Sequence, residues 1–128
     1  MMELITFDKT TKRPVIRDSK PFITVNELGK FNFSQGARRL LSLADGDRVI
    51  LHQDAVFRSD WYMEITRDDR GYSIVQSKSD SRFTCTRIAV EIFKSVGRKP
   101  QKMSFPIATR QSKVGDMHLW AIETKKPL

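Results

Sequence analysis

The sequence predicts an α+β fold made of two consecutive ββαββ units. Three observations support this prediction: a length of 128 residues, short β-rich runs that flank two short amphipathic helices, and a recurrence of similar segments after about 50 to 57 residues. A chain of this length buries roughly two-thirds of its unfolded surface, so it can fold without a metal or a disulfide.

The chain begins with a predicted β-hairpin over residues 1–20. Residues 3–7 alternate apolar and polar side chains, residues 8–14 form a polar turn, and residues 15–16 resume an extended chain. Pro21 limits this second strand to an edge or to its own end, because proline cannot donate a ladder hydrogen bond. The hairpin is therefore an extension that precedes the first unit.

The first unit covers residues 21–68 and contains one short helix. Ser34 is a plausible N-cap, and Ala37, Leu40 and Leu41 recur at helical spacing after it. The turn Asp45-Gly46-Asp47 ends this region. The four predicted strands are residues 22–25, 30–33, 48–51 and 61–65.

The second unit covers residues 71–125 and repeats this order. Thr86 is the expected N-cap of its helix, and Gly97 ends that helix because glycine tolerates a left-handed conformation. Pro106 places its strand at a sheet edge. Residues 125–128 are expected to fray. The predicted strands are residues 72–75, 82–85, 104–107 and 119–122.

The two units match each other in register. Residues 22–25 match residues 72–75 at an offset of 50, residues 30–34 match residues 82–86 at 52, and Met63 matches Trp120 at 57. The offset grows only across predicted loops, where insertions cost little. Chance similarity between two amphipathic units is the alternative. Packing about a pseudo-two-fold axis would bury both units in a monomeric pseudo-dimer or in a homodimer.

Composition excludes several classes of protein. No apolar run is long enough for a transmembrane span and no secretory signal opens the chain, so we expect no membrane partner. A single cysteine, Cys85, cannot form an internal disulfide, which favours a cytoplasmic location. His52 and His118 lack a carboxylate at motif spacing, and no glycine pattern matches a phosphate loop. We therefore predict no enzymatic activity, no cofactor and no metal.

The net charge of +8 lies almost entirely in the second half of the chain. Residues 1–68 hold 11 basic and 10 acidic side chains, whereas residues 69–128 hold 12 basic and 5 acidic ones. Such asymmetry predicts a polyanionic partner, most often nucleic acid, although a basic surface can also be merely solubilising.

Residues 25–34, 37–43 and 45–49 together resemble the AbrB-type swapped-hairpin DNA-binding domain. The shared pattern is strand, glycine, basic residue, strand, short helix with paired arginines, leucine, then Gly-Asp and a strand. The resemblance implies a swapped-hairpin-like β-barrel and DNA binding by a small transcriptional regulator. It also implies that Lys30, Arg38 and Arg39 contact phosphates and bases. Here Ser34 and Ser42 stand where that family has proline and glycine, and Val90 and Glu91 oppose the two arginines in the second unit.

The predicted function is non-catalytic DNA binding, with DNA favoured over RNA. Charge alone adds further candidate contacts in the second unit: Arg82, Arg87, Lys94, Arg98, Lys99 and Lys102. Two other functions stay open, namely an assembly module that meets an acidic protein and a single-stranded nucleic-acid binder. The latter goes with an alternative fold, in which four strands precede each helix, as in whirly-type repeats.

Overall fold

The computed structural model describes residues 20–128, so the hairpin predicted for residues 1–20 lies almost entirely outside the described part. The elements in chain order are β1 (Phe22–Val25), β2 (Lys30–Phe33), α1 (Gln35–Leu40), β3 (Arg48–Gln53), β4 (Trp61–Thr66), β5 (Tyr72–Ser73), β6 (Val75–Gln76), β7 (Ser81–Thr84), α2 (Thr86–Ser95), β8 (Met103–Val114) and β9 (Met117–Ile122). Neither helix within these residues is long and apolar enough to span a membrane.

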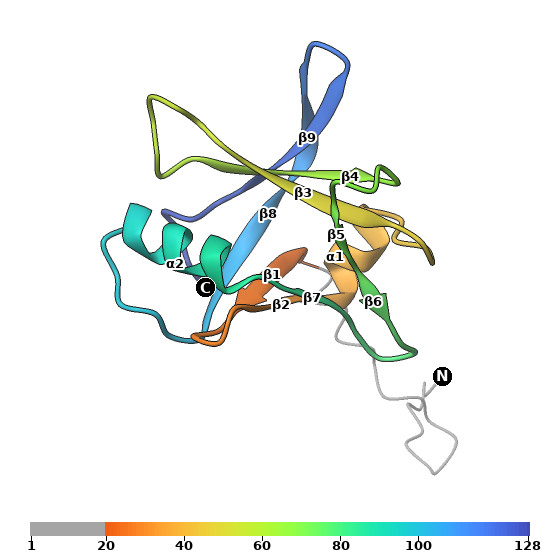
Figure 1. Cartoon of the computed structure of the whole chain (residues 1–128), viewed down its shortest axis with the longest axis horizontal. Coiled ribbons are helices and arrows are strands. Elements are labelled where there is room, and N and C mark those ends of the chain that lie inside the picture. Colours follow the sequence, from red (N-terminus) through yellow and green to blue (C-terminus); the bar gives the residue numbers. More distant parts are fainter. Residues whose placement is uncertain (1–19) are drawn as a thin grey trace, which may run out of the picture.

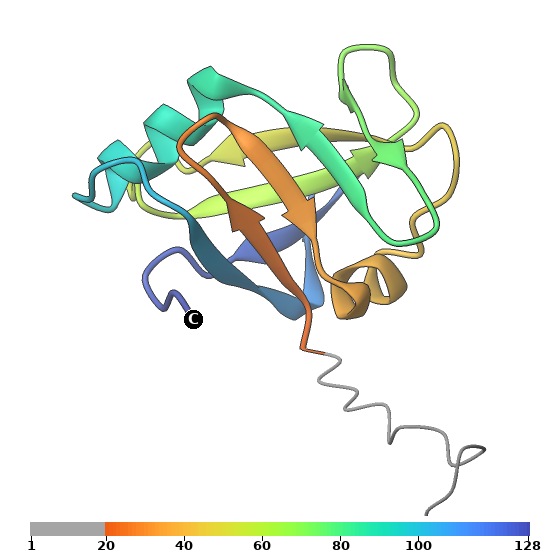
Figure 2. The same cartoon turned by 90° about the horizontal axis from the view of Figure 1, so that it is seen from below.

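The strands form a nearly closed antiparallel barrel, with α1 and α2 at opposite ends of it (Figures 1 and 2). Their order is β5-β3-β4-β9-β8-β1-β2-β7-β6. The two outermost strands are consecutive in the chain: β5 pairs with β3, and β6 pairs with β7. Ile74 between them is buried, and its N–H donates to the Asp47 carbonyl at 3.3 Å. One kinked segment, residues 72–76, thus joins the two edges of the sheet. The predicted α+β class and the predicted barrel are confirmed.

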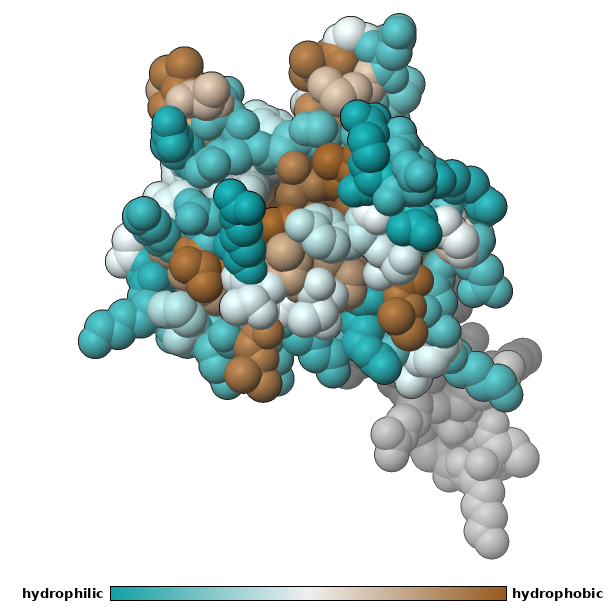
Figure 3. Space-filling model, viewed as in Figure 1, coloured by the Kyte–Doolittle hydropathy of each residue, from teal (hydrophilic) through white to brown (hydrophobic). Residues whose placement is uncertain are grey.

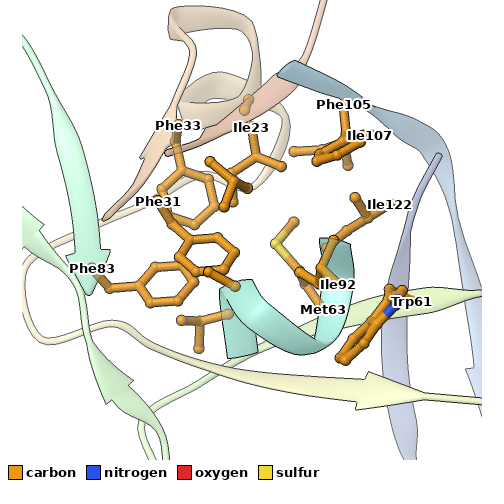
Figure 4. Packing of buried hydrophobic residues seen from close by; sticks show 14 of the residues in the cluster. Ile23, Phe31, Phe33, Trp61, Met63, Phe83, Ile92, Phe105, Ile107 and Ile122 are labelled. Atoms are coloured by element: carbon orange, nitrogen blue, oxygen red, sulfur yellow. The ribbon is translucent and has the colours of Figure 1, made fainter. Parts of the chain in front are cut away.

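The barrel interior is filled by side chains that alternate along the strands (Figure 4). Along β2, for example, Phe31 and Phe33 are buried while Lys30 and Asn32 are partly exposed. The Phe31 ring stacks on Phe83 of β7, with ring centroids 4.5 Å apart. Period-2 alternation therefore assigns one side of each strand to the core.

The two helices start differently. The Ser34 hydroxyl oxygen accepts a hydrogen bond from the Ala37 N–H at 3.1 Å and caps α1, as predicted. In α2 the N-cap is Cys85, which makes no side-chain capping bond, so the prediction of Thr86 is wrong by one residue. The Cys85 N–H donates to the Gly29 carbonyl at 2.9 Å, and the Thr86 hydroxyl donates to the Leu28 carbonyl instead. Tertiary contacts to the β1–β2 turn set this boundary.

The prediction that Pro106 marks a sheet edge is wrong. Strand β8 is longer than expected and lies between β1 and β9. Its pairing with β1 ends at Pro106, and its pairing with β9 begins at Ile107 and has a register irregularity before Gln111. At that end of the β8–β9 ladder, the Pro106 carbonyl accepts from the Glu123 N–H at 2.8 Å. An interior strand tolerates this proline because it lies where one pairing gives way to the other.

The strand pairings of residues 21–68 have counterparts among those of residues 71–125. The β1–β2 hairpin corresponds to β6–β7, the β3–β4 hairpin to β8–β9, and the β1–β8 pair to the β5–β3 pair. Between the halves, Phe31 lies opposite Phe83, and Met63 lies opposite Trp120. These are the residue pairs that the offsets of 52 and 57 match in the sequence.

Candidate nucleic-acid interface

Helix α2 presents a basic stripe to solvent. Ala89, Ile92 and Phe93 are buried against the barrel, whereas Arg87 and Lys94 are exposed. At 3.6 residues per turn, positions seven apart fall on the same face, so these two cations lie on the side opposite the core. Glu91, also exposed, lies between them.

The basic stripe continues into the loop that follows α2. Gly97, with φ of +69°, ends the helix, and the Arg98 N–H donates to the Phe93 carbonyl at 3.0 Å. Arg98, Lys99 and Lys102 are all exposed in this loop. These positive charges lie near the negative end of the helix dipole, which they also stabilise.

The C-terminal segment lies against this loop, so the predicted fraying of residues 125–128 is wrong. The Leu128 N–H donates to the Ser104 carbonyl at 2.8 Å, and the buried Thr124 hydroxyl donates to the Ser59 carbonyl. A cavity of about 370 Å³ is lined by both Arg98 and Lys125, among other residues. We define the basic cluster as five exposed residues of α2, the following loop and the C-terminal segment: Lys94, Arg98, Lys99, Lys102 and Lys125.

Few acidic groups neutralise the basic cluster. Lys125 Nζ lies 3.2 Å from Asp60 Oδ1. The other four members, and Arg87, take part in no ion pair with residues 20–128. Exposed cations that make no ion pair repel each other and attract a polyanion.

A second pair of candidate residues lies on the outer side of the barrel, on β2 and β7. Lys30 and Arg82 flank the Phe31–Phe83 pair, one in each half. Arg82 Nη1 is 3.0 Å from Asp80 Oδ2. A hydrogen bond from the Ser77 hydroxyl, and then Arg82 and Lys30, lower the pKa of Asp80. This carboxylate partly neutralises both cations.

The arginine pair of α1 lies apart from the basic cluster. Arg38 Nη2 donates to the Ser77 carbonyl at 3.0 Å, so it links α1 to the β6–β7 turn. Arg39 is exposed. Because α1 and α2 occupy opposite ends of the barrel (Figure 2), the predicted contacts on α1 are separate from those on α2 and the loop after it. Lys30 and Arg82, on β2 and β7, form a third group.

The remaining candidates for chemistry are spread over the barrel. His52 Nε2 lies 3.1 Å from Glu64 Oε1, a carboxylate that sequence spacing did not reveal because it comes from the neighbouring strand. Cys85 is half-buried, with its thiol 3.3 Å from the Tyr72 hydroxyl. The described region holds no group of three potential metal ligands. Trp61 is buried, and its indole N–H donates to the Ser95 hydroxyl at 2.9 Å.

Comparisons with protein-family models, with curated proteins and with solved structures find no match to this chain.

Proposed function

We propose that this protein binds DNA without catalysis and that the basic cluster contacts the phosphate backbone. The observation that carries the proposal is the concentration of exposed cations on α2 and the loop after it that make no ion pair with any of residues 20–128. Backbone phosphates supply most of the affinity of such surfaces and make it depend steeply on salt. Arginine in the cluster can also bind a phosphate through two hydrogen bonds.

We further propose that the barrel is an internally duplicated swapped-hairpin domain of AbrB type that acts as a transcriptional regulator. The matched strand pairings support duplication, because Phe31–Phe83 and Met63–Trp120 pair equivalent residues. The single chain is then a pseudo-dimer. Only one half carries the arginine pair, Arg38–Arg39, so the two ends of the barrel make different contacts with DNA.

The experiment that tests DNA binding is fluorescence anisotropy with duplex DNA, single-stranded DNA and RNA at 50 and 200 mM salt. Each phosphate that a protein neutralises on a duplex contributes about 0.9 to the slope of log affinity against log salt. We expect R98E/K99E to lower this slope by about 2. The matched variant R38E/R39E, at the other end of the barrel, should lower it less because Arg38 is held by Ser77.

Affinity that is the same at both salt concentrations would contradict the proposal. If neither double variant alters DNA retention while R98E/K99E no longer binds a protein partner, the surface belongs to an assembly module for an acidic protein. Tighter binding of RNA than of either DNA would contradict the choice of DNA.

A further inference from the structure

Two projections extend from the same side of the barrel, and both end in apolar side chains (Figures 1 and 3). The first is the β3–β4 connection, residues 54–60, where Val56 and Phe57 are 80% and 63% exposed. The second is the outer part of the β8–β9 hairpin, residues 110–118, where Val114 is 53% exposed. Burying such side chains in water-soluble proteins is favourable, so exposing them at two tips calls for an explanation.

The first projection holds its apolar tip in one conformation. The Asp54 carboxylate accepts hydrogen bonds from the N–H groups of Val56 and Phe57 at 2.7 and 2.8 Å. The Asp60 N–H donates to the Phe57 carbonyl at 2.9 Å, and Asp54 and Asp60 also close the loop through their backbones at 3.0 Å. The Phe57 ring is therefore presented to solvent by a preorganised loop.

The second projection is a two-stranded ribbon that extends beyond the rest of the barrel. Every residue from Thr109 to Asp116 is exposed. Its register pairs Val114 with Met117 on one face and Lys113 with His118 on the other. One face of the ribbon is thus apolar at the tip, and the opposite face carries positive charge.

Under the proposed duplication the β3–β4 hairpin corresponds to the β8–β9 hairpin, so the two tips are the ends of corresponding hairpins. Each tip has an exposed cation next to it in the chain, Arg58 beside Phe57 and Lys113 beside Val114. The two projections therefore share the same chemistry, an apolar end with an adjacent positive charge.

We infer that the two tips are wedges that enter a DNA duplex and kink it, an inference that rests on the proposed DNA binding. Proteins that bend DNA insert apolar side chains between base steps from the minor groove, while nearby cations contact the phosphates. A duplex has local two-fold symmetry that two corresponding projections can match. Phe57 and Val114 supply the wedges, and Arg58 and Lys113 supply the adjacent phosphate contacts.

Further cations lie at both ends of the barrel, Arg38 and Arg39 on α1 and the basic cluster at α2. Wedges that enter from the minor groove typically kink a duplex by about 20–90° toward its major groove, so the bound duplex should bend away from the two tips.

The test measures the distance between the ends of a 30-base-pair duplex by energy transfer between terminal dyes, in parallel with anisotropy. The wild-type protein should bring the ends closer at saturation. F57S/V114S should still bind with a salt-dependent affinity but leave the duplex as straight as free DNA. The control L28S replaces another exposed apolar residue, 72% exposed in the β1–β2 turn, and should bend DNA like the wild type.

The outcomes separate this inference from the proposed function. Salt-dependent binding by the wild type without any change in dye distance overturns the wedges alone, as does full bending by F57S/V114S. Absence of DNA binding by the wild type overturns both. Sedimentation of the wild type, but not of F57S/V114S, with vesicles of one-third phosphatidylserine would reassign the tips to a lipid surface and overturn the wedges. Circular dichroism of each variant checks that it is folded.

Discussion

The two halves of the barrel share their strand pairings but differ in what they add to them. In residues 21–68 the helix has 6 residues and a side-chain cap, and the second hairpin closes with a hydrogen-bonded loop. In residues 71–125 the helix has 10 residues without such a cap, and β8 alone spans 12 residues. The basic cluster lies in this half, at the end of the longer helix and in the segments next to it.

This difference shows which parts of the molecule the barrel constrains. Strand pairing and the inward side chains must agree between the halves, since both contribute to one core. The two halves can differ in helix length, loop length and the charge of outward-facing side chains, because these features are exposed to solvent and do not affect the packing of the core. The second half carries the basic cluster, and among residues 20–128 no such cluster surrounds the arginine pair of α1.

The largest expected effect comes from the residues at which the halves meet. Phe83→Ala and Phe31→Ala should each lower the free energy of unfolding by about 3–5 kcal/mol, because each leaves a cavity beside its stacked partner. Chemical denaturation measures both variants. Nearly equal losses of stability in the two variants would support the equivalence of the halves. A loss of stability in only one of the two variants would contradict it. The exposed control F57A should change stability by less than about 0.5 kcal/mol.

Two glycines with positive φ distinguish a packed turn from an open one. A Cβ at Gly29 would lie 2.5 Å from the Thr86 Cα, whereas a Cβ at Gly97 would meet nothing within 4 Å. Gly29→Ala should therefore cost about 2–4 kcal/mol through strain and displacement of α2. Gly97→Ala should cost about 1 kcal/mol from its backbone conformation alone. Thermal unfolding of both variants tests this order, and equal costs would contradict the close contact at Gly29.

A smaller loss of stability should distinguish the N-terminus of α1 from that of α2. Ser34→Ala removes the acceptor for the Ala37 N–H and should cost about 1 kcal/mol. Ser34→Thr keeps a hydroxyl and should restore most of that loss. Cys85→Ala removes no capping bond and should cost about 0.5 kcal/mol or less. Urea unfolding measures all three variants, and a larger loss at Cys85 than at Ser34 would reverse the comparison.

The smallest effect is local and concerns the two projections. Hydrogen bonds from the Phe57 and then the Val56 N–H lower the pKa of Asp54. A lowered pKa in the folded state means that these bonds are complete above the ordinary carboxyl value of about 3.9 and are lost as pH falls through the lowered value. Amide NMR shifts of Val56 and Phe57 should therefore stay constant from pH 7 to about 4 and move below it.

The amide of Val114, whose ribbon is held by strand pairing, serves as the reference in the same titration. Its shift should stay nearly constant over this range. In D54N, which keeps a side-chain acceptor, the Phe57 amide should no longer respond. If the Phe57 amide shift of D54N still changes with pH, a titrating group other than Asp54 is responsible for the change.

Much of the fold and part of the site follow from the sequence. Alternation placed the four strands of residues 21–68 and three of the four in residues 71–125, whereas the predicted strand 72–75 divides into β5 and β6 at Ile74. Ser34 and Gly97 marked a helix start and a helix end because their conformations are local properties. The exposed cations of α2 also follow from its periodicity. The capping residue Cys85, the hydrogen bond between His52 and Glu64 and the link from Arg38 to Ser77 do not, since their partners come from distant segments.

The linear order of apolar and polar residues thus determined which segments are strands or helices and which side of each faces the core, because these depend on local periodicity. Only the tertiary structure decided how residues 72–76 close the barrel, why Pro106 is tolerated inside it and how the C-terminal segment brings Lys125 to Arg98. Each of these depends on hydrogen bonds or contacts between residues far apart in the chain, and a local pattern does not identify such partners.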